Sequence, residues 1–172
     1  MFWAEIHSLF REPLVYVKNI AHRLHRNGTG STQIVYGSLE DKMDFLHKDL
    51  TSRIIRCFYE VYNNLGYGFL EKVYERAMMV ELVREGLLAN SQFPIQVFYK
   101  GHLVGDYWAD ILVEGKIILE LKAAENVAPE HELQLINYLK GTDVEIGLLL
   151  NFGVKPEVRR KILTNDRKIS DT

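Results

Sequence analysis

The sequence predicts an α/β (α+β) domain, in which helices flank a mixed central sheet of about four strands. Two kinds of observation support this class. Apolar residues recur at helical spacing in some segments and alternate or run continuously in others. The order of these segments is helix, helix, three strands, helix, strand, helix (ααβββαβα), with no internal repeat. The chain has 172 residues, 47% of them hydrophobic, which suits one domain with a substantial core.

Two helices are predicted before the strands. The first has Asp49 as a plausible N-cap and ends near Gly66, a residue type that favours helix ends. The second runs from Gly68 to Gly86 and has two coherent faces. We expect the purely apolar face to pack on the core. Periodicity does not decide whether Glu71, on the other face, is a solvated residue or a functional one. The apolar face consists of Leu70, Val73, Ala77, Val80 and Val83 or Arg84. The other face consists of Glu71, Tyr74, Glu75 and Met78.

A strand over residues 91–100 leads into a β-hairpin whose arms cover residues 107–113 and 116–123. Three polar residues interrupt the apolar arms, namely Asp110, Glu120 and Lys122. Side chains alternate along a strand, so Glu120 and Lys122 share one face. A three-residue loop centred on Gly115 would place Asp110 opposite Glu120, whereas a two-residue loop would separate them.

These polar residues allow three interpretations. They can face solvent as ordinary cross-strand charge pairs. They can also form a buried ion cluster, or they can hold a metal ion. Glu120 lies within the run IILEL, which is apolar enough for a sheet covered on both faces, and this weakens the first interpretation. A buried charge without a partner costs several kcal/mol, so the other two remain open.

Beyond the hairpin, the sequence predicts a helix over residues 130–140 and a buried strand over residues 144–150. A final basic helix is predicted over residues 156–163. Residues 1–42 show only loose helical spacing followed by a glycine-rich break, and we interpret them as an N-terminal extension of the domain at residues 43–172.

Charge and composition restrict the class of protein. Residues 43–154 carry 10 basic and 16 acidic side chains, a net charge of −6, which would repel a polyanion unless cations are bound. No apolar run is long enough for a transmembrane helix, so no membrane partner is expected. The single cysteine, Cys57, falls in an apolar helical pattern and indicates an inert thiol in a reducing, cytoplasmic compartment. The oligomeric state is not predicted.

Four motifs together resemble a known superfamily. Asp110 followed by Glu120-Leu121-Lys122 resembles the core of the PD-(D/E)XK nucleases, and the order of the elements is similar to their restriction-endonuclease-like fold. The stretch from Gly68 to Tyr74 resembles the signature of the GxxExxY protein family within that superfamily. Residues 134–138, QLINY, resemble the Q-x-x-x-Y helix motif of its exonuclease-like branch. The resemblance covers about residues 45–163, and Ala109 stands where the superfamily has proline.

The resemblance implies a metal-dependent nuclease that acts on DNA or RNA, with Mg²⁺ or Mn²⁺ as cofactor. Its alternative is a catalytically idle module that binds nucleic acid or a protein partner, because a fold alone does not imply activity. The implied metal ligands are Asp110, Glu120, the carbonyl of Leu121 and Glu71, and the implied catalytic residues are Asp110, Glu120, Lys122 and Gln134. Residues implied or expected to contact substrate are Tyr74, Tyr138, Arg159, Arg160 and Lys161, although a solvated basic tail would explain the last three equally well.

Overall fold

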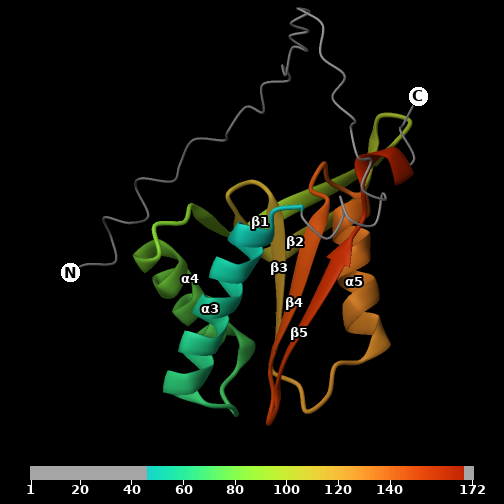
Figure 1. Cartoon of the computed structure of the whole chain (residues 1–172). Coiled ribbons are helices and arrows are strands. Elements are labelled where there is room, and N and C mark those ends of the chain that lie inside the picture. Colours follow the sequence, from blue (N-terminus) through green and yellow to red (C-terminus); the bar gives the residue numbers. More distant parts are fainter. Residues whose placement is uncertain (1–45, 169–172) are drawn as a thin grey trace, which may run out of the picture. The chain divides into compact units, whose positions relative to one another are not determined.

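The structure, a computed structural model, describes residues 46–168 (Figure 1). The predicted extension at residues 1–42 lies outside the described residues. The elements in chain order are α3 (Lys48–Leu65), α4 (Glu71–Arg84), β1 (Ala89–Tyr99), β2 (His102–Val113), β3 (Ile117–Lys122), α5 (Pro129–Lys140), β4 (Ile146–Phe152), β5 (Pro156–Ile162) and the short 3-10 helix η1 (Asn165–Arg167).

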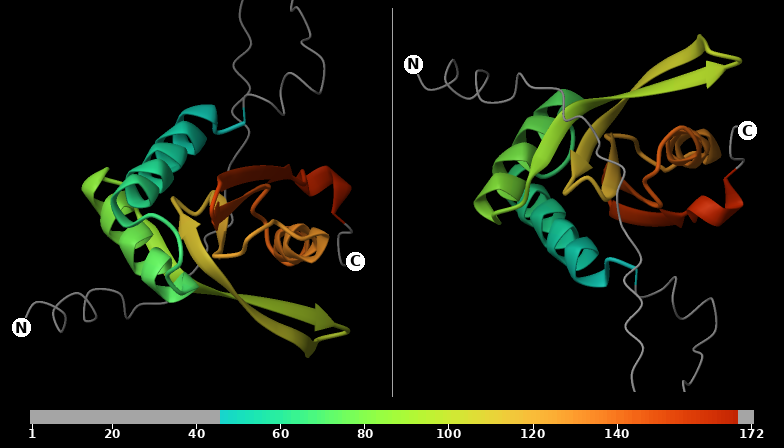
Figure 2. Two further views of the ribbon diagram at one scale, coloured as in Figure 1. Left: turned by 90° about the horizontal axis from the view of Figure 1, so that it is seen from below. Right: turned by 90° about the horizontal axis from the view of Figure 1, so that it is seen from above.

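The five strands form one sheet in the order β1-β2-β3-β4-β5. Only β3 and β4 are parallel, and α5 connects them, as expected for a βαβ unit. Helices α3 and α4 cover one face of the sheet and α5 covers the other (Figures 1 and 2), so each face has its own buried apolar cluster. The predicted mixed sheet flanked by helices is therefore confirmed, with five strands rather than about four.

The fifth strand replaces the predicted final helix. The segment over residues 156–163 was expected to be helical, but it pairs antiparallel with β4 from Ile146↔Ile162 to Phe152↔Pro156. The reason lies in the tertiary structure. Strand β4 is buried along its whole length, and without β5 the backbone N–H and C=O groups along its outer edge would lack hydrogen-bond partners, which costs free energy. The segment has only seven residues, so its periodicity alone does not distinguish a helix from a strand.

Helix α4 buries the face opposite to the one expected. Tyr74, Glu75, Met78 and Leu82 are buried, whereas the expected core residues of the other face are exposed: Leu70, Val73, Val80 and Val83. The helix is apolar on both faces, so periodicity could not select one. The larger side chains decide it, because Tyr74 stacks on Phe152 with ring centroids 4.2 Å apart and so fills more of the core than a valine can.

Helix α3 follows its prediction closely. It ends at Gly66, which has a φ of 68°. Such a positive φ favours glycine. Its N-cap position is His47 rather than the predicted Asp49, which lies in the first turn, where a carboxylate interacts favourably with the helix dipole. Within the described part of the chain, no helix combines the length and apolar character needed to span a membrane.

The hairpin register agrees with the three-residue loop centred on Gly115. Val113 pairs with Ile117, and the ladder between β2 and β3 continues to Ile111↔Leu119. Continuing this register places Asp110 opposite Glu120. The β1–β2 pair is longer than the rest of the sheet, and its far end extends beyond the other strands (Figure 2).

Candidate active site

The site forms where β2 and β3 separate. Regular pairing between the strands ends at Ile111↔Leu119. Beyond that pair, the backbone N–H of Leu121 donates to Oδ2 of Asp110 at 2.7 Å. A side-chain carboxylate thus takes the position that a strand carbonyl would have in a continued ladder. This bond holds Asp110 beside β3 at the level of Glu120.

Glu120 is a buried carboxylate with only one of its oxygens paired. Its side chain is 2% exposed, and Nζ of Lys122 donates to Oε1 at 2.6 Å. Among the described residues, no hydrogen-bond donor reaches Oε2, which is buried. Buried polar atoms nearly always have a partner, so this oxygen is suited to a ligand that the protein itself does not supply.

The carboxyl groups of Asp110 and Glu120 repel each other. Burial and the nearby charge of Asp110 raise the pKa of Glu120 to about 7, although Lys122 opposes both effects. Burial also raises the pKa of Asp110, against the effect of the Leu121 N–H. Burial alone would lower the pKa of Lys122, but its bond to Glu120 and the surrounding carboxylates raise it, so this lysine is protonated at neutral pH. A bound cation would relieve the repulsion.

Helix α4 brings Glu71 to the end of β3. The residue opens the helix, and its Oε1 accepts a hydrogen bond from the Ala123 N–H at 3.4 Å. The charge of Glu71 also contributes to the raised pKa values of Asp110 and Glu120. The structure thus places Glu71 at the end of β3, where its charge acts on the hairpin carboxylates.

Tyr74 has a structural position, although it was expected to contact substrate. Its side chain is fully buried, and its hydroxyl group donates to the Gly66 carbonyl at 3.0 Å and accepts from the Phe69 N–H at 3.2 Å. Both bonds hold the loop that precedes α4. Tyr74 thus fixes the point at which the helix begins, and with it the position of Glu71.

Helix α5 contributes Gln134 and Tyr138. Nε2 of Gln134 donates to the Tyr138 hydroxyl at 2.7 Å. Burial raises the pKa of Tyr138, and the charges of Glu120 and Asp110 add to this effect, so the phenol lies within the field of the two carboxylates. The predicted pair on α5 is therefore joined by a hydrogen bond, and the charges of the hairpin carboxylates reach its tyrosine.

The three cations of β5 are divided between the two faces of the sheet. Lys161 forms an ion pair with Glu132 of α5, whereas Arg160 donates to the Leu46 carbonyl at 2.8 Å, at the start of α3. Arg159 bonds Glu157 on its own strand at 2.8 Å. Because side chains alternate along a strand, these residues do not form one continuous basic patch.

The protein supplies some, but not all, of the oxygen ligands that a hard divalent cation needs. Within residues 46–168, no three or more His, Cys, Asp or Glu side chains form a group that could hold a metal ion. Asp110 and Glu120 supply two carboxylates, and the Leu121 carbonyl is a third oxygen of the same segment. Mg²⁺ is commonly bound by one or two carboxylates together with water and substrate phosphate, so this set matches its chemistry.

A family model for the PD-(D/E)XK nuclease superfamily matches residues 48–161, more than half of the chain. The chain belongs to this superfamily. Comparisons with curated proteins and with solved structures gave no match. PD-(D/E)XK nucleases generally use divalent metal ions, and the matched range extends from the start of α3 into β5. It therefore includes each element that contributes to the cluster around Asp110 and Glu120.

Sequence reasoning gave no role to two residues beside this PD-(D/E)XK cluster. Glu75 is 5% exposed and accepts a hydrogen bond from Gln92 of β1. The sequence offered one signal for Glu75, its position one helical turn after Glu71 on the same face. Gln92 gave none, because nothing in an alternating strand marks one exposed glutamine as different from the next.

Proposed function

We propose that this protein is a metal-dependent nuclease that hydrolyses phosphodiester bonds in DNA or RNA. The observation that supports it best is the pair of carboxylates at the point where β2 and β3 separate. The charge of Asp110 helps to raise the pKa of Glu120, and Glu120 Oε2 is buried without a partner among the described residues. Neither feature is expected of a pair that serves only to stabilise the sheet.

The proposed metal ligands are the carboxylates of Asp110 and Glu120 and the carbonyl of Leu121, with Glu71 bound through water. When bound there, Mg²⁺ or Mn²⁺ lowers the pKa of a water molecule and stabilises charge on a phosphate. The pair-wise repulsion described above favours occupation by a cation. The net charge of −6 over residues 43–154 also requires one before a polyanion can approach.

Lys122 would neutralise charge on the scissile phosphate. Its raised pKa keeps it protonated at neutral pH, which suits it to electrostatic stabilisation better than to removal of a proton from water. Gln134 and Tyr138 would orient the phosphate or hold Lys122 in place, since the field of the carboxylates reaches Tyr138. Arg159 and Lys161 are proposed to contact the nucleic-acid backbone from β5.

We further propose that the protein is a GxxExxY family member located in the cytoplasm. The buried Tyr74 supports the first point, because its two bonds to the preceding loop give the tyrosine of the signature a structural reason. The second point stays a prediction from the single buried Cys57.

Calorimetric titration of Mn²⁺ into the wild type and the Asp110→Ala and Glu120→Ala variants tests the metal site. We expect a binding isotherm for the wild type and its loss in both variants. Equal heats in all three proteins would contradict the proposal. Incubation of linear DNA, circular DNA and single-stranded RNA with Mg²⁺ or Mn²⁺ then tests cleavage, which should disappear in Lys122→Ala.

The alternative function is a nuclease-fold module without catalysis that binds nucleic acid or a protein. One observation favours it: Glu71 does not join Asp110 and Glu120 in a metal-binding group among residues 46–168. The two functions differ in the same experiments. The idle module would show no metal-dependent cleavage of any of the three substrates, even at millimolar Mn²⁺.

A further inference from the structure

Strand β1 departs from regular strand conformation at Gln92, across from the candidate metal ligand Asp110. The register pairs Ser91 with Ile111 and Phe93 with Ala109, so Gln92 and Asp110 lie between these two pairs on neighbouring strands. Gln92 has a φ of 53°, in the left-handed region. For a residue other than glycine this conformation costs about 1–2 kcal/mol, and it persists only where the surroundings hold it.

Glu75, a buried carboxylate of α4, holds Gln92 in this conformation. Nε2 of Gln92 donates to Oε2 of Glu75 at 3.0 Å, and Nζ of Lys72 bonds both oxygens of the same carboxylate at 2.7 and 2.9 Å. Glu75 is 5% exposed. A hydrogen bond to an ionised acceptor is stronger than one between neutral groups. Glu75 therefore ties β1 to α4 at the residue where β1 departs from regular strand geometry.

Asp110 departs from regular strand pairing at the same level of the sheet. One residue beyond the last regular β2–β3 pair, Asp110 turns its carboxylate to the Leu121 N–H instead of continuing the ladder. Because Gln92 lies across from Asp110 on the neighbouring strand, a change of Gln92 to regular strand conformation would displace the β2 backbone at Asp110.

We propose that Glu75, acting through Gln92, is a positioning residue that sets the Asp110 carboxylate against Leu121 and Glu120. This inference rests on the proposed nuclease function only for its purpose, because the positioning itself is a property of the metal-free protein. An apolar side chain of similar size at position 75 would avoid the free-energy cost of burying a charge, but it would supply no directional bond to Gln92.

Exchange of the two partners tests the proposal. In Gln92→Glu two carboxylates face each other, so the bond is lost. In the double variant Glu75→Gln/Gln92→Glu the new glutamine donates to the new carboxylate, and the bond is restored with its polarity reversed. The first readout is hydrogen exchange of the Leu121 amide in metal-free protein, followed by NMR. The second is the dissociation constant for Mn²⁺ alone, measured by calorimetry.

We expect Gln92→Glu to lower the protection of the Leu121 amide at least tenfold and to weaken Mn²⁺ binding by about 10–100-fold, the usual effect of losing a group that orients a metal ligand. In the exchanged pair, Leu121 protection and Mn²⁺ affinity should both return to within about threefold of the wild-type values. The reason is that the restored bond again holds residue 92 in its conformation, so the effects of the two substitutions are coupled.

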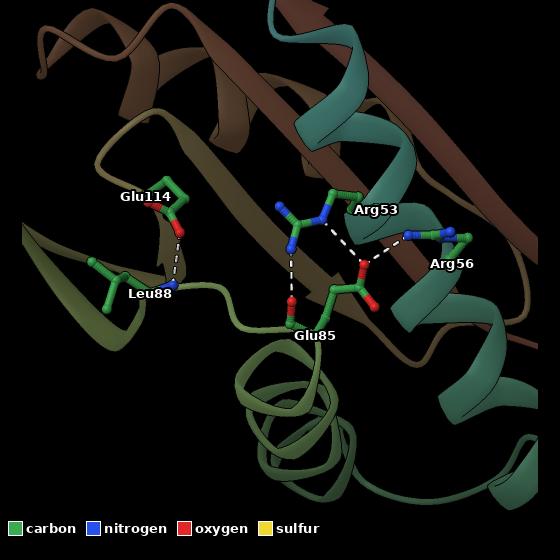
Figure 3. Close-up of polar contacts among 5 residues, drawn as sticks. All are labelled: Arg53, Arg56, Glu85, Leu88 and Glu114. Atoms are coloured by element: carbon green, nitrogen blue, oxygen red, sulfur yellow. Dashed lines mark hydrogen bonds and ion pairs between the residues drawn. The ribbon is translucent and has the colours of Figure 1, made fainter.

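A matched control separates positioning from general stability. Glu85 also joins elements far apart in the sequence, because its Oε1 accepts from Arg53 at 3.1 Å and from Arg56 at 2.7 Å, between α4 and α3 (Figure 3). Glu85→Gln should lower the melting temperature and leave both readouts unchanged.

The outcomes are distinguishable. Wild-type protection at Leu121 in Gln92→Glu, or failure of the folded double variant to recover it, would overturn the proposal. Equal loss in Glu85→Gln would also overturn it, because the effect would then be one of stability. If the wild type binds no Mn²⁺ while Leu121 responds as expected, the positioning stands and the proposed function fails.

Discussion

At the scale of single residues, Asp110 carries two roles that one substitution can separate. Its carboxylate accepts the Leu121 N–H, and its charge raises the pKa of Glu120. Asp110→Asn keeps an oxygen acceptor for the N–H and removes the charge. In metal-free buffer we expect the free energy of unfolding to stay equal or to rise by about 1 kcal/mol, because repulsion is relieved. Mn²⁺ binding should be lost.

Urea unfolding with and without Mn²⁺ measures both effects. The interpretation as a purely structural ion cluster makes the opposite prediction, since removal of one charge would leave its partners buried and uncompensated. A loss of more than about 1 kcal/mol in metal-free Asp110→Asn would support that interpretation and count against the metal site.

Glu120 makes the stability of the metal-free protein depend on pH. Its pKa is about 7 in the folded protein, against an ordinary value of 4.5, so the folded state binds a proton more tightly than the unfolded state. The stabilisation is complete below pH 4.5 and is lost as the pH rises through 7. The difference in unfolding free energy between wild type and Glu120→Gln should change by up to about 3 kcal/mol over this window.

Unfolding measured at intervals of half a pH unit, in EDTA, tests this dependence. The difference between the two proteins should be flat below pH 4.5 and above about pH 8. Mn²⁺ affinity should rise over the same window, because the ion competes with the proton for the carboxylate. A difference that does not vary with pH would mean that folding leaves the pKa of Glu120 unchanged, and would contradict the prediction.

At the scale of elements, α4 offers a direct test of which face is buried. Met78 is fully buried and Val80 is 53% exposed, although both lie in the same apolar helix. Met78→Ala should cost about 2–5 kcal/mol, because it leaves a cavity in the core, whereas Val80→Ser should change stability by no more than about 0.5 kcal/mol. Chemical unfolding of both variants tests the assignment, and similar losses in the two would contradict it.

The elements also show what a sequence can and cannot predict here. The existence of the hairpin follows from short-range signals around Gly115, but the sequence left its loop length open. The structure has the three-residue loop, whose register brings Asp110 opposite Glu120. Strand β5 depends on β4, whose need for a pairing partner is visible only in the folded sheet. The buried face of α4 depends on the shape of the space beside Phe152. The left-handed Gln92 depends on Glu75, which lies on another element.

At the scale of the whole molecule, the site exists only because four elements meet. Helix α4 brings Glu71, and the hairpin strands bring Asp110 and Glu120. Helix α5 brings Tyr138, which the charges of these carboxylates reach, together with its partner Gln134. None of these elements carries enough oxygen ligands alone. The matched superfamily range includes all four, which explains why the fold and the proposed chemistry could be predicted together.

The acidic character of the domain leads to a final prediction about nucleic-acid binding. Residues 43–154 have a net charge of −6, and two of the carboxylates lie where the phosphate is proposed to bind. In EDTA, the double variant Asp110→Asn/Glu120→Gln should therefore bind a fluorescent oligonucleotide about 3–10 times more tightly than the wild type at 50 mM salt. The difference in affinity between the two proteins should disappear above about 300 mM salt, since screening weakens repulsion between charges.

Fluorescence anisotropy with single-stranded and duplex oligonucleotides measures these affinities without cleavage, because no divalent ion is present. The double variant Glu81→Gln/Glu85→Gln also removes two carboxylates, at the end of α4 opposite to Glu71, and serves as the control for net charge. If this control gains as much affinity as Asp110→Asn/Glu120→Gln, the oligonucleotide is repelled by the net charge of the domain and not by the site carboxylates in particular. A gain confined to Asp110 and Glu120 would mean that the phosphate approaches the point where β2 and β3 separate, as the proposed function requires.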